Sequence, residues 1–372
     1  MTETAEQRTG QYDFPFSHDL IAQEPAEVRG TARSDARLLV LDRRTDTVEH
    51  RRFADVGRYL APGDALVVNN ARVVPSILRG TDARGKPIVV NVFSPMEDGT
   101  WHCLVLPAPT AVPGERFRFG ADGEVTGELL HEESVGVWRL RLEPGGVDVL
   151  SRVGQIAYPD YLDKDPEDPE YYQTSLATRP GATLFPSAAR HFTPELLGSL
   201  QEQGVSVVEV THFIAARWQH GYLREWLGQD VEWADDEGVD LPRGRAGVSL
   251  PFPRPERYEV SLRAADTLNE RRRAGGRIVV CGTSALRALE TVADDRTGRV
   301  WPGSGWTNLI LGPGHRFKVC DSFLTNFHMP QSSELRLTSA FTGAPELLRV
   351  YREEVLPNGY LFNEFGDSML IV

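Results

Sequence analysis

The residues best placed to bind a ligand follow a short apolar run in the second half of the chain. The run Ile278–Cys281 leads into Gly282, Thr283 and Ser284, and Arg287 stands one helical turn further on. Backbone N–H groups at the start of a helix attract carboxylate or phosphate, and a guanidinium there adds a charged clamp. The same pattern also occurs at ordinary helix N-caps, so a ligand site and a simple cap are both consistent with it.

A second polar group lies further along the chain, around the end of another apolar run. Its members are Asp321, Thr325, Asn326 and His328. A core strand tolerates so many polar side chains only when they line a cavity or satisfy one another. The group is therefore a candidate for a site, with internal hydrogen bonding as the alternative.

The histidines and cysteines do not form a metal-site pattern. Neither His191 nor His328 has a second ligand at helical or hairpin spacing, and Cys103, Cys281 and Cys320 are far apart without a CxxC pair. We therefore predict neither a metal nor a disulfide framework. A histidine in such a context is either a hydrogen-bonded structural residue or an acid–base group. Both glycine-rich nucleotide motifs are absent from the sequence.

Charge and hydropathy limit the class of protein. The 372 residues carry a net charge of −13, which argues against a surface that binds nucleic acid everywhere but allows a local basic patch. The triplet Arg271–Arg273 is one such patch, or it complements a helix dipole. No run of about 18 apolar residues exists and Met1–Gly10 is polar, so we predict no membrane span and no secretory signal. A cytoplasmic protein is expected.

Strand-like and helix-like runs alternate in the second half of the chain. Thr193-Pro194 predicts the start of a helix, and Val205–Val210 predicts a strand. The order repeats with a helix at Ala264–Arg273, the strand that precedes Gly282, and a helix at Ala285–Val292. This βαβ order predicts a largely parallel sheet with helices on both faces.

The middle of the chain has a different pattern. Short strand-like runs are separated there by turn dipeptides such as Asp98-Gly99 and Asp122-Gly123, which are typical of hairpins in a small antiparallel barrel. An acidic stretch with several prolines follows and is expected to be a linker. We therefore predict an α/β domain made of residues 11–77 and 159–372, with a barrel domain of residues 78–158 inserted into it.

Several blocks of sequence are similar to one known family. They are Leu20–Pro25, Arg37–Asp42, Gly63–Asn69, Arg72–Pro75, Tyr172–Thr174, Trp306-Thr307, Pro313–Lys318, Thr325–Pro330 and Gly366–Met369. The blocks occur in the family's order and over nearly the whole length. By these motifs the chain resembles the S-adenosylmethionine:tRNA ribosyltransferase-isomerase family of queuosine biosynthesis.

The resemblance implies a Rossmann-like mixed α/β domain with an inserted small antiparallel six-stranded β-barrel. It also implies a reaction in which S-adenosylmethionine is the ribosyl donor and no metal is required. The sulfonium acidifies a C5′ proton, a base removes it, and the aminomethyl group of 7-aminomethyl-7-deazaguanine in tRNA attacks the sugar. Adenine and methionine leave, and the ribose rearranges to give epoxyqueuosine. We expect a monomer or weak homo-oligomer with no membrane partner.

The motif positions carried over from the family, together with the helix start and the polar group described above, predict three groups of site residues. The implied catalytic residues are His191, Glu256 and Arg287. The residues implied to bind S-adenosylmethionine or substrate are Gln173, Ser187, Thr283, Ser284, Asp321, Thr325, Asn326 and His328. Those implied on the acceptor side are Asn69 and Arg72.

The chain departs from the family pattern inside some of these blocks. Ala189 replaces a glycine and Arg190 introduces a large cation, while Thr211–Gln219 lacks the family's histidine and both glycines and gains Trp218. The block Pro251–Glu256 keeps only its glutamate. Larger side chains in place of glycine would reshape a pocket. Two alternatives to tRNA modification therefore stand: an enzyme that uses S-adenosylmethionine or a related nucleoside on a small molecule, and a non-catalytic binding protein of the same fold.

Overall fold

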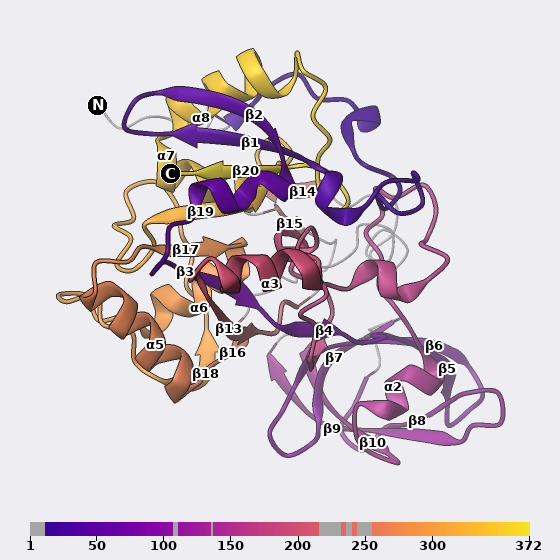
Figure 1. Cartoon of the computed structure of the whole chain (residues 1–372). Helices are drawn as coiled ribbons and strands as arrows, with labels where there is room; N and C mark the ends of the chain where they lie inside the picture. Colours follow the sequence, from indigo (N-terminus) through magenta and orange to yellow (C-terminus); the bar gives the residue numbers. More distant parts are fainter. Residues whose placement is uncertain (1–11, 107–110, 135–136, 216–231, 236–239, 244–254) are drawn as a thin grey trace, which may run out of the picture.

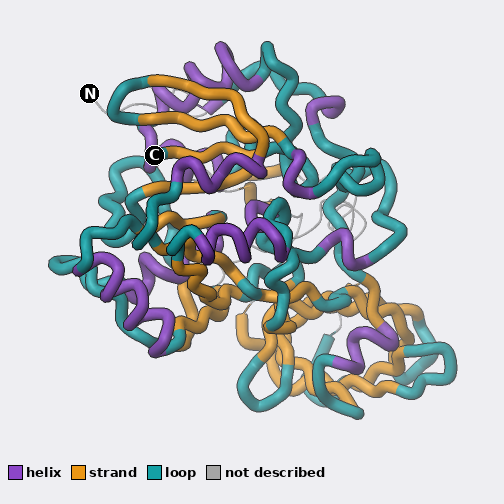
Figure 2. The backbone as a smooth tube through the Cα atoms, in the orientation of Figure 1, coloured by secondary structure: helices purple, strands orange, loops and turns teal. Residues whose placement is uncertain are grey.

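The computed structural model describes residues 12–106, 111–134, 137–215, 232–235, 240–243 and 255–372, which form two domains (Figure 1). The larger domain contains both ends of the described chain, and the smaller one is a β-barrel at the lower right of the view. Figure 2 shows the same division by secondary structure. Of the helices labelled in Figure 1, α2 (Asp148–Val153) lies in the barrel domain and the others lie in the larger domain.

The larger domain is built on one mixed sheet. Its described strands, in spatial order, are β18 (Gly303–Thr307), β16 (Glu256–Val260), β13 (Ser206–His212), β3 (Ala65–Asn69), β17 (Ile278–Cys281), β19 (Ser322–Asn326), β20 (Ser368–Ile371), β1 (Arg37–Asp42) and β2 (Thr47–Arg52). The centre from β13 to β19 is parallel, as expected. The neighbours on either side, β16 and β20, pair antiparallel with this centre, so the parallel arrangement does not extend over the whole sheet.

Helices cover both faces of this sheet. One face carries α5 (Leu262–Arg273), α6 (Thr283–Val292), α7 (Ser333–Thr342) and α8 (Ala344–Val350). The other face carries α3 (Pro194–Glu202) and the 3₁₀ helices at residues 53–59 and 187–189. Side chains alternate along a strand, so Ala65 and Val67 of β3 join the first core while Leu66 and Val68 join the second. The helix predicted at Thr193-Pro194 is confirmed, because the Thr193 hydroxyl caps α3.

The smaller domain is a closed antiparallel barrel of six strands. They are β5 (Ile77–Asp82), β6 (Pro87–Pro95), β7 (Trp101–Leu106), β10 (Val137–Glu143), β9 (Val125–Ser134) and β8 (Arg116–Phe119), and pairing of β5 with β8 closes the ring. Inward side chains such as Phe117, Phe119 and Leu140 fill it. Gly127 leaves room for this packing, because a Cβ there would lie 2.9 Å from the Phe119 ring. The predicted barrel is therefore present.

Three further strand pairs complete the described structure. The short strand β11 (Gly154–Gln155) extends the barrel sheet at β5. At the junction of the two domains, β4 (Ala71–Val73) pairs with β12 (Arg179–Ala182). The last pair is β14 (Glu232–Asp235) with β15 (Asp240–Arg243). Within the described residues, none of the helices has the length and apolar character needed to cross a membrane.

Candidate functional site

The carboxyl ends of the parallel strands bring polar residues from distant segments to one edge of the sheet. Asn69 ends β3, His212 ends β13 and Asn326 ends β19, while Gly282 follows β17 and begins the turn into α6. Gly282 has a φ of 86°, a left-handed conformation that glycine adopts without strain. Ligands of open α/β sheets bind at this edge. The fold therefore assembles a candidate site from four strands.

The side chain of Asn69 joins three of these strand ends. Its Nδ2 donates to the carbonyl of His212 at 2.9 Å and to Oγ of Ser284 at 3.0 Å. Its Oδ1 accepts from the backbone N–H groups of Ala71 and His212, both at 3.0 Å. These four bonds use both donors and both acceptor positions of the amide. Asn69 therefore fixes the geometry of the edge, whereas the motif had placed it on the acceptor side.

A buried charged cluster lies beside this junction. Oε1 of Glu256 accepts the N–H of Ala215 at 3.0 Å, and Oε2 contacts both Nη1 of Arg287 and Nε2 of His212, the latter at 3.2 Å. Nε of Arg287 also donates to the carbonyl of Leu309 at 2.9 Å. The side chains of His212, Glu256 and Arg287 are 0%, 5% and 13% exposed. Buried charges require such pairing, so the three residues act as one unit.

His212 is a member of this unit that the motif comparison missed. The comparison treated the segment as lacking its family histidine, yet a histidine stands at the last position of β13. Strand alternation directs its ring toward Glu256, while the Thr211 hydroxyl donates to Asn70 and Phe213 packs in a separate small core. The sequence feature that could have identified His212 is a histidine at the end of a strand predicted to be buried.

A short 3₁₀ helix closes the other side of the Gly282 turn. A Cβ on Gly282 would lie 3.5 Å from the Cβ of Ala188 in this helix. The hydroxyl of Ser187, its first residue, donates to Oδ1 of Asn326 at 3.1 Å. Nδ2 of Asn326 in turn donates weakly to the carbonyl of Asp367 at 3.4 Å. Ser187 and Asn326, two of the residues placed in the site by the sequence analysis, are thus in contact, next to Thr283 and Ser284 at the start of α6.

Thr325 and His328 form a second polar pair just beyond the end of β19. Oγ1 of Thr325 and Nε2 of His328 are 2.9 Å apart, and the backbone N–H of His328 donates to the Tyr351 hydroxyl at 3.1 Å. Desolvation lowers the pKa of the His328 imidazole to about 4. The ring is therefore neutral at physiological pH, and in that state Nε2 accepts a hydrogen bond or donates one according to its tautomer.

Comparison with known proteins identifies the family. A sequence profile described as "Queuosine biosynthesis protein" matches residues 9–219 and 252–371. The chain belongs to this family.

Relatives in the queuosine biosynthesis family are similar over their full length. The S-adenosylmethionine:tRNA ribosyltransferase-isomerase of Symbiobacterium thermophilum is 38% identical over 370 residues, which covers 98% of this chain and 100% of the relative. The protein of the same name from a Thermoanaerobacter species is 35% identical over 369 residues, with 98% and 100% covered.

A solved structure agrees with the fold. The crystal structure of an S-adenosylmethionine tRNA ribosyltransferase from Thermotoga maritima matches with a TM-score of 0.53 and 29% identity, covering 97% of this chain and 100% of that one. The mixed α/β fold with a closed six-stranded barrel, expected from the sequence, is confirmed.

Two residues that the sequence analysis placed among those binding the donor or substrate lie elsewhere. Asp321 precedes β19, and its carboxylate accepts the N–H of Ile278 at 2.7 Å at the amino edge of the sheet. It therefore stands at the opposite end of the strand from Asn326. The Gln173 amide pairs with the N–H and carbonyl of Val73 at 3.0 and 2.9 Å, which fastens the return linker to β4.

The motif residues His191 and Arg72 are also separate from the charged cluster. His191 is buried, its Nδ1 lies 3.0 Å from the carbonyl of Arg33, and its ring packs 5.0 Å from that of Phe53. Desolvation first, and the nearby charge of Arg190 second, lower the pKa of His191 to about 4. Arg72 forms an ion pair with Glu170 at the surface.

Some expectations lie outside the described residues. Trp218 lies outside them, as do residues 216–219 of the altered segment Thr211–Gln219 and residues 251–254 of the altered segment Pro251–Glu256. In the part of the chain that is described, no group of three or more histidine, cysteine, aspartate or glutamate side chains is arranged to hold a metal ion.

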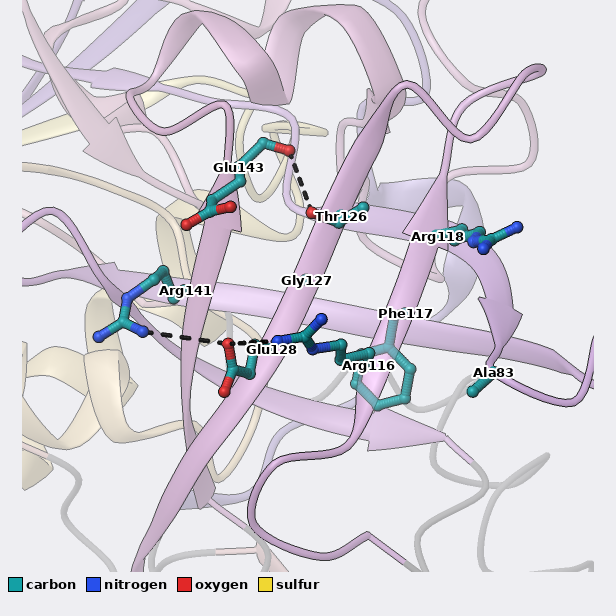
Figure 3. A pocket seen from close by; sticks show the side chains of 9 residues that line it. All are labelled: Ala83, Arg116, Phe117, Arg118, Thr126, Gly127, Glu128, Arg141 and Glu143. Atoms are coloured by element: carbon teal, nitrogen blue, oxygen red, sulfur yellow. Dashed lines mark hydrogen bonds and ion pairs between the residues drawn. The ribbon is translucent and has the colours of Figure 1, made fainter.

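The barrel carries a separate hollow on its outer face (Figure 3). Its volume is about 310 Å³. A row of three charged side chains crosses three strands here, with Glu128 of β9 between Arg116 of β8 and Arg141 of β10. The Glu128 carboxylate lies 3.9 Å from the guanidinium of Arg116 and 4.0 Å from that of Arg141. Arg118 also lines the hollow and points away from this row, without an ion-pair partner among the residues described. The hollow is therefore rich in arginine in a chain of net charge −13.

Proposed function

We propose that the protein transfers and isomerises the ribosyl group of S-adenosylmethionine onto 7-aminomethyl-7-deazaguanine in tRNA, giving epoxyqueuosine with release of adenine and methionine. The observation that carries the proposal is the buried His212–Glu256–Arg287 unit at the carboxyl edge of the sheet, in a chain whose full-length relatives bear the name of that activity. The alternatives raised by the sequence have no comparable support.

Arg287 is the group we assign to the methionine carboxylate of the donor. Its Nε and Nη1 are used by Leu309 and Glu256, which leaves Nη2 without a partner among the described residues. A guanidinium held by two bonds is pre-oriented, so little side-chain entropy is lost when a carboxylate binds. The first N–H groups of α6, at Thr283 and Ser284, add positive potential at the same edge.

Glu256 orients Arg287 in this proposal and does not act as a free base. One carboxylate oxygen accepts a backbone N–H, and the other contacts a guanidinium and an imidazole. Both oxygens are thus engaged by other groups of the protein, which leaves neither free to accept a proton from the donor. The C5′ proton of the donor therefore goes to another group.

The arginine hollow on the barrel is the candidate contact for the tRNA backbone. The three arginines Arg116, Arg118 and Arg141 line the hollow together with two carboxylates, those of Glu128 and Glu143, so one positive charge is not balanced there. Arginine pairs with phosphate through its planar donors, and local contacts of this kind suffice although the whole chain is acidic. We further propose a cytoplasmic enzyme that is a monomer or weak homo-oligomer and works without a metal.

Incubation with S-adenosylmethionine tests the proposal. The protein is given tRNA carrying 7-aminomethyl-7-deazaguanine, unmodified tRNA, or no RNA, each with and without EDTA, and adenine is quantified by mass spectrometry. We expect adenine and epoxyqueuosine only with the modified tRNA, unaffected by EDTA. Adenine release without RNA would instead indicate a small-molecule acceptor, and no release in any mixture would contradict catalysis.

A further inference from the structure

His212 occupies a position in the site that none of the assigned roles explains. It is the last residue of β13 and is completely buried. Its backbone is fixed by Asn69, which bonds both its N–H and its carbonyl. The two ring nitrogens face two different elements, the start of α6 on one side and β16 on the other. The ring therefore bridges the helix that carries Arg287 and the strand that carries Glu256.

The two nitrogens of the ring have different partners. Nδ1 is 2.9 Å from the carbonyl of Ser284, and because a carbonyl only accepts, Nδ1 carries a proton. Nε2 is 3.2 Å from Oε2 of Glu256, which as a carboxylate oxygen also only accepts. The two atoms are within ion-pair distance but lack the geometry of a hydrogen bond, so the ring lies against the carboxylate at this nitrogen and is hydrogen-bonded only at Nδ1 among the described residues.

The charged groups near the ring lie on the side of Glu256. Glu256 faces the guanidinium of Arg287 as well as the imidazole, and the N–H of Ala215 holds its second oxygen. Among the residues described, the other hydrogen-bond partners of His212 are the Asn69 amide and the Ser284 carbonyl, which carry no net charge. The Glu256 carboxylate is thus contacted from two sides, by the guanidinium and by the imidazole ring, which restricts its position more than Arg287 alone would.

We propose that His212 is a positioning residue: by bridging the Ser284 carbonyl and the Glu256 carboxylate, it holds Glu256 where it aims Arg287 at the donor. This inference rests on the proposed function, in which Arg287 binds the carboxylate of S-adenosylmethionine. It assigns to His212 an effect on donor binding, transmitted through Glu256, and no contact with the reacting atoms.

Two substitutions separate the two contacts of the ring. In His212→Asn the amide nitrogen lies near the place of Nδ1, so the bond to Ser284 persists while the contact with Glu256 is lost. In His212→Gln the longer amide reaches toward the place of Nε2, so the contact with Glu256 persists. We expect His212→Asn to raise KM for S-adenosylmethionine about tenfold with kcat changed less than about threefold, and His212→Gln to stay within about threefold of wild type.

Equal KM values for the two variants, whether both raised or both unchanged, would overturn the proposal, since they would mean that the Glu256 contact has no separate effect. Thermal unfolding of each variant controls for lost packing. Crystal structures of both variants test the position of Arg287 independently of activity. Arg287 should keep its contact with Glu256 in His212→Gln and shift in His212→Asn. An inactive wild-type protein would contradict the proposed function alone, whereas unshifted Arg287 in both variants would contradict the role of His212.

Discussion

The guanidinium of Arg190 and the carboxylate of Glu27 lie 2.7 Å apart, and Arg190 is completely buried. Nε of Arg190 also donates to the carbonyl of Tyr171 at 3.2 Å. Burial lowers the pKa of Arg190 to about 10, which leaves the side chain charged at neutral pH. The sequence comparison had suggested that this cation would reshape the pocket. The structure corrects that expectation, because the side chain ends on Glu27, away from the charged cluster at Glu256.

Substitution of Glu27 should destabilise the fold. Glu27→Gln leaves the buried guanidinium of Arg190 without a countercharge, and we expect a loss of about 3 kcal/mol in the free energy of unfolding. Glu49→Gln is the matched control, because Glu49 pairs with Arg51 at the surface and should cost less than about 1 kcal/mol. Urea denaturation of the two variants measures the difference. Equal losses would show that the Arg190 pair is solvated.

The structure shows why some site residues could be predicted from the sequence and others could not. The turn from Cys281 through Gly282 into α6 was predictable because strand, glycine and helix are neighbours in sequence and their conformations are locally determined. His212 was not predictable in the same way. Its role depends on the pairing of β13 with β16, which brings Glu256 from more than forty positions away. Register between distant strands is a tertiary property.

A group of polar residues in the sequence also does not show at which edge of the sheet each residue lies. Asp321 and Asn326 flank the same short strand, so composition alone could not show that they lie at opposite edges of the sheet. Gln173 illustrates a second limit. Its motif matched the family, but the side chain forms two backbone bonds to Val73, a structural role that a motif does not distinguish from ligand binding.

Stability should depend on pH through His191. The pKa of the buried imidazole is about 4, against 6.5 for an unperturbed histidine. Above pH 6.5 the folded and unfolded chains both hold it neutral. As the pH falls from 6.5 toward 4, only the unfolded chain binds the proton, so stability decreases, by up to about 3 kcal/mol, and the loss levels off below pH 4.

Comparison with His191→Asn isolates this contribution. The shorter amide keeps a donor for the Arg33 carbonyl and does not titrate, so its stability should fall less between pH 6.5 and 4 than that of wild type. His131→Asn, at a side chain 59% exposed, serves as the control and should follow the wild-type curve. Parallel curves for wild type and His191→Asn, measured by urea denaturation at each pH, would refute the assignment.

Arg287 should be sensitive to a substitution that keeps its charge. Lysine carries its three donors on a single nitrogen, so it cannot occupy the separate positions of Nε and Nη1 that bond the Leu309 carbonyl and the Glu256 carboxylate. Arg287→Lys should therefore lower kcat/KM for S-adenosylmethionine at least about tenfold, roughly 1.4 kcal/mol. Arg296 is exposed, so the control variant Arg296→Lys should leave kcat/KM unchanged. Wild-type kinetics for Arg287→Lys would place the donor carboxylate elsewhere.

Charge reversal on the barrel should weaken the binding of tRNA without affecting the binding of S-adenosylmethionine. Arg118 lines the hollow of Figure 3, and Arg118→Glu would put a carboxylate where we expect a phosphate. The Kd for tRNA should rise about tenfold and the slope of log Kd against log salt should fall by about one, while KM for S-adenosylmethionine stays unchanged. Arg152→Glu makes the same charge change on α2, at an exposed position that does not line the hollow, and should alter the Kd much less. Filter binding at several salt concentrations decides the matter, because equal effects of the two variants would mean that only overall charge counts and that the hollow is not the contact.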